Sequence, residues 1–229
     1  DVLRVDLGAQ VFGRGSTAFI RDQSDYGNHL YANCVFVAVA AGENPGKFIM
    51  EYDGRRGMIF GPGGGGKHGG GGELLSFDSF SLNSPALGNS VTLEAEIFIP
   101  KQPIGCENGI LGKGSFDISL DSDGRILFRL WVMEKDKRRR LVLRSDEPLS
   151  AGKWHKIRAG FDGRTARLLL DGKLAASEEA AAGARILPAM GAKSPGAVAG
   201  FYFSQPQVTD RKNLVIATVR IANGWSGDR

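Results

Sequence analysis

Residues 149–177 read LSAGKWHKIRAGFDGRTARLLLDGKLAAS, and the alternation within this stretch decides the fold class. Ile157, Ala159 and Phe161 fall on one side of an extended chain, as in a strand with one face against a core. Two Asp-Gly dipeptides follow, and they are typical of hairpin turns because glycine adopts positive φ without steric cost. The stretch therefore predicts antiparallel strands over residues 154–162 and 166–176.

The same period of two recurs from residue 90 onward. In SVTLEAEIFIP, residues 90–100, every second residue from Val91 to Ile99 is apolar, which is the pattern of a half-buried antiparallel strand. The one stretch of helical composition, residues 178–185, is too short to define a helical layer. Further strands are predicted at 29–40, 47–52, 116–121, 126–133, 138–144 and in two segments after residue 197. We therefore expect an all-β fold, a two-sheet antiparallel β-sandwich or jelly roll, in a single domain over residues 1–229.

A glycine-rich segment, residues 61–72, interrupts the series of strands. Its first seven residues, GPGGGGK, fit the G-x-x-x-x-G-K pattern of a phosphate-binding loop. However, His68 stands where a Ser or Thr would hold magnesium, and the four glycines after it are a poor start for the helix that such a loop needs. We therefore expect no nucleotide as a ligand and interpret the segment as a surface insert between strands.

The net charge of +4 is unevenly distributed. Residues 134–144, EKDKRRRLVLR, hold six basic and two acidic residues, so this stretch alone has a charge of +4. The pattern indicates either a solvated hairpin or a surface for a polyanion such as an acidic polysaccharide. We expect no nucleic acid as a partner, because no aromatic stacking series or helix-turn-helix pattern accompanies the charge.

Two further features limit the class of protein. No apolar run approaches the ~20 residues needed to cross a bilayer, so no transmembrane segment is expected. Cys34 and Cys106 lie 72 residues apart without the spacing of a zinc site. They are equally consistent with a disulfide and with two buried free thiols.

Several motifs occur in an order that resembles a known family. The hairpin of residues 149–177 is preceded by NSVTLEAEIFIPK (89–101) and GILGKGSFDISLDSDGRILFRL (109–130), with RDQSDYGNHL (21–30) upstream and VIATVRIANGWS (215–226) downstream. This set resembles the laminin-G-like jelly rolls of the concanavalin A-like lectin/glucanase superfamily, with residues 61–72 as an insertion. The resemblance implies a jelly-roll β-sandwich in an exported protein that is secreted, periplasmic or at the cell surface.

The resemblance also implies a structural calcium ion (Ca2+), which prefers oxygen ligands. The candidate ligands are Asp22, Asp25 and Asn28 in the 21–30 segment, with Asp53 as an addition. The chain departs from the family at residues 216–219, Ile-Ala-Thr-Val, where acidic side chains are often found.

Because this fold hosts lectins, adhesion modules, glycoside hydrolases and polysaccharide lyases, the function has to be argued from a site. The sequence lacks a convincing catalytic set, and we predict a noncatalytic module that binds a polysaccharide, a glycoconjugate or another surface partner. A purely structural part of a larger assembly stays an alternative. One exposed patch that combined the basic segment with aromatic side chains such as Tyr26 or Tyr31 would favour this hypothesis. The candidate ligand-binding residues are Arg138, Arg139, Arg140, Arg144 and Trp225.

Two enzymatic alternatives stay open. Glu94 and Glu96 point to one side of a strand about 6.5–7 Å apart, which suits the two carboxylates of a glycoside hydrolase. A groove with aromatic side chains and a raised carboxyl pKa would favour that alternative.

A lyase acting on an acidic polysaccharide would combine the arginines with a base such as His155. The alternation, however, puts His155 on the core-facing side of its strand, which favours a structural role.

Overall fold

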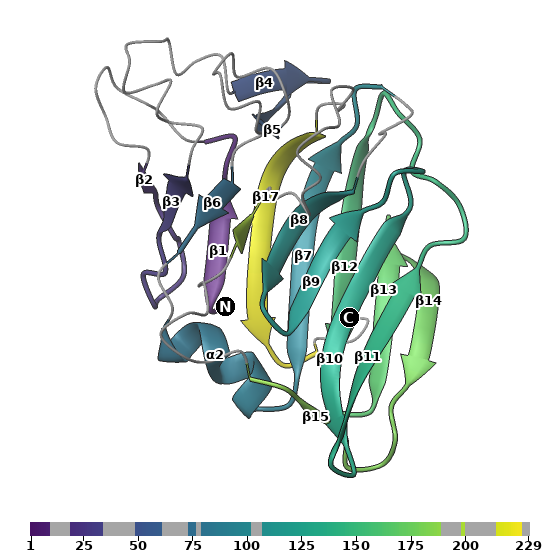
Figure 1. Cartoon of the computed structure of the whole chain (residues 1–229). Coiled ribbons are helices and arrows are strands. Elements are labelled where there is room, and N and C mark those ends of the chain that lie inside the picture. The colour runs from purple at the N-terminus through teal and green to yellow at the C-terminus, as the bar shows by residue number, and fades with distance from the viewer. Residues whose placement is uncertain are drawn as a thin grey trace.

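The period-two segments form two antiparallel sheets, as the sequence predicts. The glycine-rich segment 61–72 and both cysteines lie outside the described residues, so the predictions about them stay untested. Figure 1 shows the two sheets facing each other as layers, with the helix α2 at one end. The computed structural model describes residues 1–9, 19–33, 49–60, 73–76, 79–101, 107–188, 198–199 and 214–225.

The first sheet has eight strands among the described residues. Its central strand β17 pairs with β7 on one side and with both β5 and β1 on the other. The first and last described strands of the chain are therefore neighbours (Figure 1). In order across the sheet the strands are β14 (Lys173–Glu179), β13 (Thr165–Leu170), β12 (Trp154–Phe161), β7 (Val91–Phe98), β17 (Leu214–Asn223), β5 (Arg55–Phe60) and β4 (Ile49–Tyr52), with β1 (Leu3–Asp6) beside β17.

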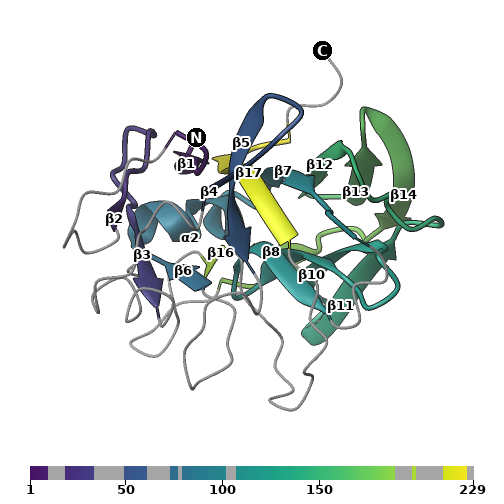
Figure 2. The same ribbon diagram turned by 90° about the horizontal axis from the view of Figure 1, so that it is seen from above.

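The second sheet has nine strands among the described residues, and β11 is the last strand at one edge. Seen from above in Figure 2, strands β8, β10 and β11 lie in one layer and β17, β7 and β12 in the other. The order across this sheet is β11 (Lys137–Arg144), β10 (Ile126–Glu134), β9 (Phe116–Leu120), β8 (Asn108–Lys113), β16 (Val198–Ala199), β6 (Glu73–Leu75), β3 (Leu30–Asn33) and β2 (Phe19–Ile20), with β15 (Arg185–Ile186) beside β10.

Alternate side chains from the two sheets meet in the core. Leu93 and Phe161 from the first sheet and Phe128 and Leu130 from the second are each 0% exposed. Burying one such side chain contributes about 1.5–3 kcal/mol. Because successive residues of a strand point to opposite faces, the polar residues between them lie on the outer faces of the sandwich.

The helix α2 (Phe80–Leu87) is an element that the sequence pattern does not predict. Ser79 caps it, since its hydroxyl oxygen accepts a hydrogen bond from the Leu82 N–H at 3.2 Å. Pro85 lacks the N–H that would bond the Ser81 carbonyl, and the Ser84 hydroxyl donates to that carbonyl instead at 2.6 Å. The helix therefore tolerates an internal proline.

Residues 178–185, whose composition is helical, do not form a helix. Glu178 and Glu179 end strand β14, where they pair with Ala166 and Thr165. A strand ladder with fixed partners is favoured here over an isolated helix of about two turns, which is marginal in water.

The turn between β13 and β14 confirms the hairpin prediction. Asp171 and Gly172 have φ values of 50° and 80°, which are the positive values that a two-residue hairpin turn requires.

Within the described residues, none of the helical structure is long and apolar enough to span a membrane.

Candidate functional site

A groove with a volume of about 770 Å³ crosses the outer face of the first sheet. It is lined by alternate positions of β1, β17, β7 and β12, because these positions point to the same side of the sheet. The backbone pairing sets the lining in two rows. One row is Arg4, Arg220, Glu94 and Arg158, and the next is Asp6, Thr218, Glu96 and Lys156.

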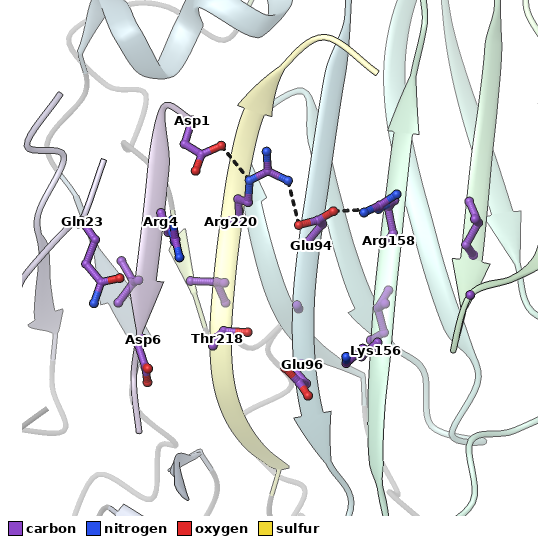
Figure 3. A pocket seen from close by; sticks show the side chains of 16 residues that line it. Asp1, Arg4, Asp6, Gln23, Glu94, Glu96, Lys156, Arg158, Thr218 and Arg220 are labelled. Carbon is purple, nitrogen blue, oxygen red and sulfur yellow. Dashed lines mark hydrogen bonds and ion pairs between the residues drawn. The ribbon is translucent and has the colours of Figure 1, made fainter. Parts of the chain in front are cut away.

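Glu94 lies in the middle of the groove between two guanidinium groups (Figure 3). Arg158 Nε donates to Glu94 Oε1 at 2.6 Å, and Arg220 Nη1 donates to Glu94 Oε2 at 2.8 Å. Arg220 Nε in turn donates to Asp1 Oδ1 at 2.7 Å. Partial burial alone would raise the pKa of Glu94, but Arg220 and Arg158 outweigh this effect and lower it. The carboxylate is therefore held ionised, with both oxygens engaged.

The second row of the groove combines one more paired carboxylate with an unpaired cation. Glu96 forms an ion pair with Arg55 of β5 and is only 9% exposed. Lys156 and, in the first row, Arg4 are exposed, and their side chains have no ion-pair partner among the described residues. The free side-chain charges that the groove presents to a ligand therefore include two cations.

Aromatic side chains lie beyond the two rows in both directions along the strands. At one end Trp154 contacts Phe98, and Phe98 stacks on Tyr52 with ring centroids 4.1 Å apart. Trp154 Nε1 also donates to the Tyr52 carbonyl at 2.8 Å, which fixes the orientation of the indole. At the other end Trp225 packs over Gly160, where any Cβ would collide with the indole ring. The arrangement combines a polar floor with apolar ends.

His155 does not reach the groove. Its side chain is 3% exposed, Nδ1 lies 2.9 Å from Asp171 Oδ2, and Nε2 lies 2.9 Å from the Ser150 carbonyl. His155 therefore faces the core, as the alternation of the sequence predicts, and its two ring nitrogens contact the segment before β12 and the β13–β14 turn. Asp171 is also desolvated, but the Lys156 N–H and His155 outweigh that effect and lower the pKa of Asp171.

The structure separates the residues that the sequence proposed as one ligand-binding set. Arg138, Arg140 and Arg144 lie on the outer face of β11 in the second sheet, whereas Trp225 lies over the first sheet. Arg139 points to the opposite side of β11 and pairs with Glu134 and Glu178. Arg144 is paired too, with Asp121 and Asp123.

The aromatic residues of the 19–33 region do not complete that set. Tyr26 is 58% exposed, but it lies in the loop after β2. The side chain of Tyr31 lies outside the described residues.

The proposed calcium ligands are largely committed to protein hydrogen bonds. The Asp22 carboxylate accepts from the N–H groups of Arg4, Ser24 and Asn28 and from the Ser24 hydroxyl, at 2.6–2.9 Å. Asn28 Oδ1 accepts from the Ser79 hydroxyl at 2.7 Å.

These donors occupy the oxygens that a calcium ion would need, so the Asp22 and Asn28 side chains do not fit it. Asp25 and Asp53 are exposed, and no cluster of three or more metal-binding side chains occurs among the described residues. The calcium prediction stays a prediction without a fitting site in this part of the chain.

Sequence reasoning identified Glu94 and Glu96 but missed their partners. Arg158 and Arg220 lie 64 and 126 residues from Glu94. The alternation assigns each of them to the polar face of its own strand, but it does not give the order of strands or their register. Finding the groove from the sequence would have required both the order of the strands and their register.

Comparison with known proteins agrees with this architecture. The family model for the concanavalin A-like lectin/glucanases superfamily matches residues 70–201, which is more than half of the 229 residues. A comparison with curated protein sequences finds no match.

Solved structures with the same fold include the binding domain of botulinum neurotoxin DC in complex with rat synaptotagmin II. It is 13% identical, the TM-score is 0.62, and the match covers 98% of this chain and 48% of that chain. The binding domain of Paraclostridial Mosquitocidal Protein 1 is 14% identical with a TM-score of 0.61, covering 96% of this chain and 48% of that one.

A structure of botulinum neurotoxin type C, described as dependent on two ganglioside molecules for entering cells, is 14% identical with a TM-score of 0.60. That match covers 98% of this chain and 48% of that one, so the chain spans about half the length of these structures. Likeness at such identities shows the fold alone. The family match and the two-sheet architecture together lead to one conclusion: the chain belongs to the concanavalin A-like lectin/glucanases superfamily.

Proposed function

We propose that this protein is a noncatalytic module of an exported protein and that it binds a glycan or glycoconjugate in the groove across the first sheet. The observation that carries this proposal is the groove itself, about 770 Å³ in volume and lined by side chains from four adjacent strands. Sites built on strands hold their side chains more precisely than sites on loops. The Asp1–Arg220–Glu94–Arg158 chain of ion pairs adds to that precision.

The chemistry of the groove suits a sugar. Sugars offer many hydroxyl groups, and the groove offers carboxylate, guanidinium, ammonium and hydroxyl partners side by side on a rigid floor. Trp154 and Trp225 lie on the same face at opposite ends, and the six steps from Trp154 to Gly160 span about 20 Å along β12. A length of this order accommodates several sugar units rather than one.

A glycoside hydrolase is less well supported. Glu94 and Glu96 do share the groove, but hydrolysis needs one carboxyl group that is protonated as an acid. The lowered pKa of Glu94 opposes that role, and Arg55 pairs with Glu96. A lyase is also disfavoured, because His155 is buried behind the first sheet while the arginines of β11 lie in the second.

The likeness to toxin binding domains is consistent with a binding role, although it supports the fold alone. One of those domains was solved in complex with rat synaptotagmin II, and another is described by its interaction with gangliosides. Both glycan binding and export are therefore proposed for this protein.

The test is a glycan array combined with a depolymerisation assay, using neutral and acidic polysaccharides with calcium or with a chelator. We expect retention without new reducing or unsaturated ends. The double variant Arg4→Ala/Lys156→Ala removes two exposed groove cations and should weaken retention about tenfold. Arg164→Ala provides the control, because Arg164 is 76% exposed in the β12–β13 turn, outside the groove.

Three results would argue against the proposal. Equal retention by the groove variant and the wild type would move the site elsewhere. New chain ends that disappear in Glu94→Gln or Glu96→Gln would make the protein a hydrolase. No retention of any glycan would remove the glycan-binding function.

A further inference from the structure

The outer face of the second sheet carries a separate basic surface, formed by Trp131, Arg138, Arg140 and Arg185 and called here the arginine–tryptophan patch. In the β10–β11 ladder Arg140 is opposite Trp131 and Arg138 is opposite Met133. On the other side of β10, strand β15 places Arg185 opposite the same Met133. Residues opposite each other in a ladder point to the same face, so the three arginines surround the outer face of β10.

The neighbouring residues confirm which face this is. Val132, next to Met133, pairs with Ile186 of β15, and both are buried in the core at 0% and 2% exposure. Arg185 therefore points outward, and it is exposed. Figure 1 shows β15 meeting the end of β10 nearest the β10–β11 turn.

Ion pairing divides the arginines of this region into two groups. Arg139 and Arg144 are held by acidic side chains, and these pairs fix strand β11 to its neighbours. The side chains of Arg138, Arg140 and Arg185 are exposed, and none forms an ion pair within the part of the chain that the structure describes. Arg140 also interacts electrostatically with Asp117, but Asp117 forms its ion pair with Arg129, so the Arg140 guanidinium remains exposed to a partner.

An aromatic side chain lies among these charges. Trp131 is 38% exposed, and the Arg140 guanidinium carbon lies 5.5 Å from its ring centroid. Val142, the next residue of β11 on the same face after Arg140, is 47% exposed. An exposed indole beside unpaired guanidinium groups offers stacking and charge-assisted hydrogen bonds at one place.

We propose that the arginine–tryptophan patch is a second binding surface, independent of the groove, for an acidic polysaccharide. The spacing of the three arginines favours a polymer over a small anion. Arg138 and Arg185 lie two strand spacings apart, about 10 Å, and Arg138 and Arg140 lie about 7 Å apart along β11. Negative groups on successive units of one chain reach all three, whereas a single carboxylate or sulfate engages one or two.

A polysaccharide fits this surface better than single-stranded nucleic acid. Proteins that bind single strands without sequence preference stack successive bases on a series of aromatic side chains along a basic groove. The patch has one tryptophan on a sheet face, and Trp131 can pack against the apolar side of one sugar ring while the arginines hold the acidic groups around it.

The experiment uses two polymers that differ only in charge, dextran sulfate and unmodified dextran of the same length. Binding of the full chain is measured by fluorescence anisotropy over a series of salt concentrations. We expect dextran sulfate to bind and dextran not to bind at this surface, and affinity should fall with salt. The variant Arg138→Gln/Arg140→Gln/Arg185→Gln should bind about tenfold more weakly and with a smaller salt dependence.

Two controls separate the patch from general charge. The variant Lys153→Gln/Arg164→Gln/Lys173→Gln removes the same number of exposed positive charges from the first sheet and its turns, and it should keep its affinity within about twofold. Trp131→Ala should weaken binding while leaving the salt dependence unchanged, because it removes a contact that is not ionic. Circular dichroism checks that each variant is folded.

Three outcomes would overturn the proposal. An equal loss in both triple variants would mean that net charge alone attracts the polymer. Dextran sulfate binding by the patch variant as tight as that of the wild type would exclude the arginine–tryptophan patch as the binding surface. Tighter binding of single-stranded oligothymidine than of dextran sulfate would identify nucleic acid as the partner. Since the groove is intact in the patch variants, these results leave the proposed function separately testable.

Discussion

At the residue scale, the ion pairs of Glu94 in the groove make the stability of the folded protein depend on pH. Because Arg220 and Arg158 lower its pKa in the folded protein, the folded state binds the Glu94 proton less readily than the unfolded chain does. The stability that this carboxylate contributes is therefore complete above the ordinary pKa of 4.5. This stability is lost as the pH falls through the lower pKa that Glu94 has in the folded protein.

We expect Glu94→Gln to lower the free energy of unfolding by about 1–2 kcal/mol at pH 7, since a charged hydrogen-bond partner of two arginines is removed. Urea unfolding of wild type and variant at neutral and strongly acidic pH measures the effect. The difference should shrink at acidic pH, where Glu94 of the wild type is protonated as well.

Glu147→Gln is the matched control, because Glu147 is exposed and has no side-chain ion pair among the described residues. It should leave the stability unchanged at both pH values. A Glu94→Gln difference that is the same at both pH values would contradict the proposed charge network.

At the element scale, the loop of residues 21–29 joins β2 to β3, and its side chains link β1 to helix α2 through hydrogen bonds. Asp22 binds the Arg4 N–H of β1, while Asn28 Nδ2 donates to the Val2 carbonyl at 2.6 Å and to Ser81 Oγ of the helix at 2.8 Å. Two short polar side chains thus hold together a strand, a loop and a helix. Their role here is hydrogen bonding within the protein.

We expect Asp22→Asn to destabilise the fold by about 2–3 kcal/mol, because the amide cannot accept all the hydrogen bonds that the carboxylate accepts. Thermal unfolding measures this, with the exposed Asp25→Asn as the control that should leave the melting temperature unchanged. Adding calcium or a chelator should not shift the melting temperature of the wild type. A calcium-dependent rise that Asp22→Asn abolishes would instead identify Asp22 as a ligand.

The sequence predicts individual elements best where one local pattern determines them. The alternation around Ile157 and the Asp171-Gly172 turn specifies a hairpin, and that hairpin is present. Helix α2 was missed because it contains Pro85 and depends on hydroxyl groups that satisfy its backbone. Arg185 was missed as a neighbour of Arg138, because their proximity depends on a two-residue strand, β15, whose pairing is set by tertiary structure.

At the scale of the whole molecule, β1 completes the centre of the first sheet although it has only four residues. Its pairing with β17 runs from Leu3 opposite Ile221 to Asp6 opposite Thr218. The fold class could be predicted from alternation, but this contact between distant ends could not, because nothing local in either strand specifies its partner. The groove depends on the same contact, since Arg4 and Asp6 form one of its walls.

We expect that removing residues 1–8 prevents stable folding. Val2, Leu3, Val5 and Leu7 are each at most 1% exposed, and burying four such side chains contributes about 6–12 kcal/mol, which is comparable with the whole stability of a typical domain. Circular dichroism and limited proteolysis of the shortened chain test this. Removal of Asp1 alone should leave a folded protein, and a cooperative unfolding transition in the chain without residues 1–8 would contradict the prediction.

The position of β17 between β7, β5 and β1 also has a consequence for synthesis in the cell. On the ribosome, residues 214–223 emerge after every other described strand, so the first sheet lacks its central strand until these residues have been made. Until then, the edge of β7 that pairs with β17 has backbone N–H and C=O groups without this partner, and such an unpaired strand edge makes an incomplete chain prone to aggregation.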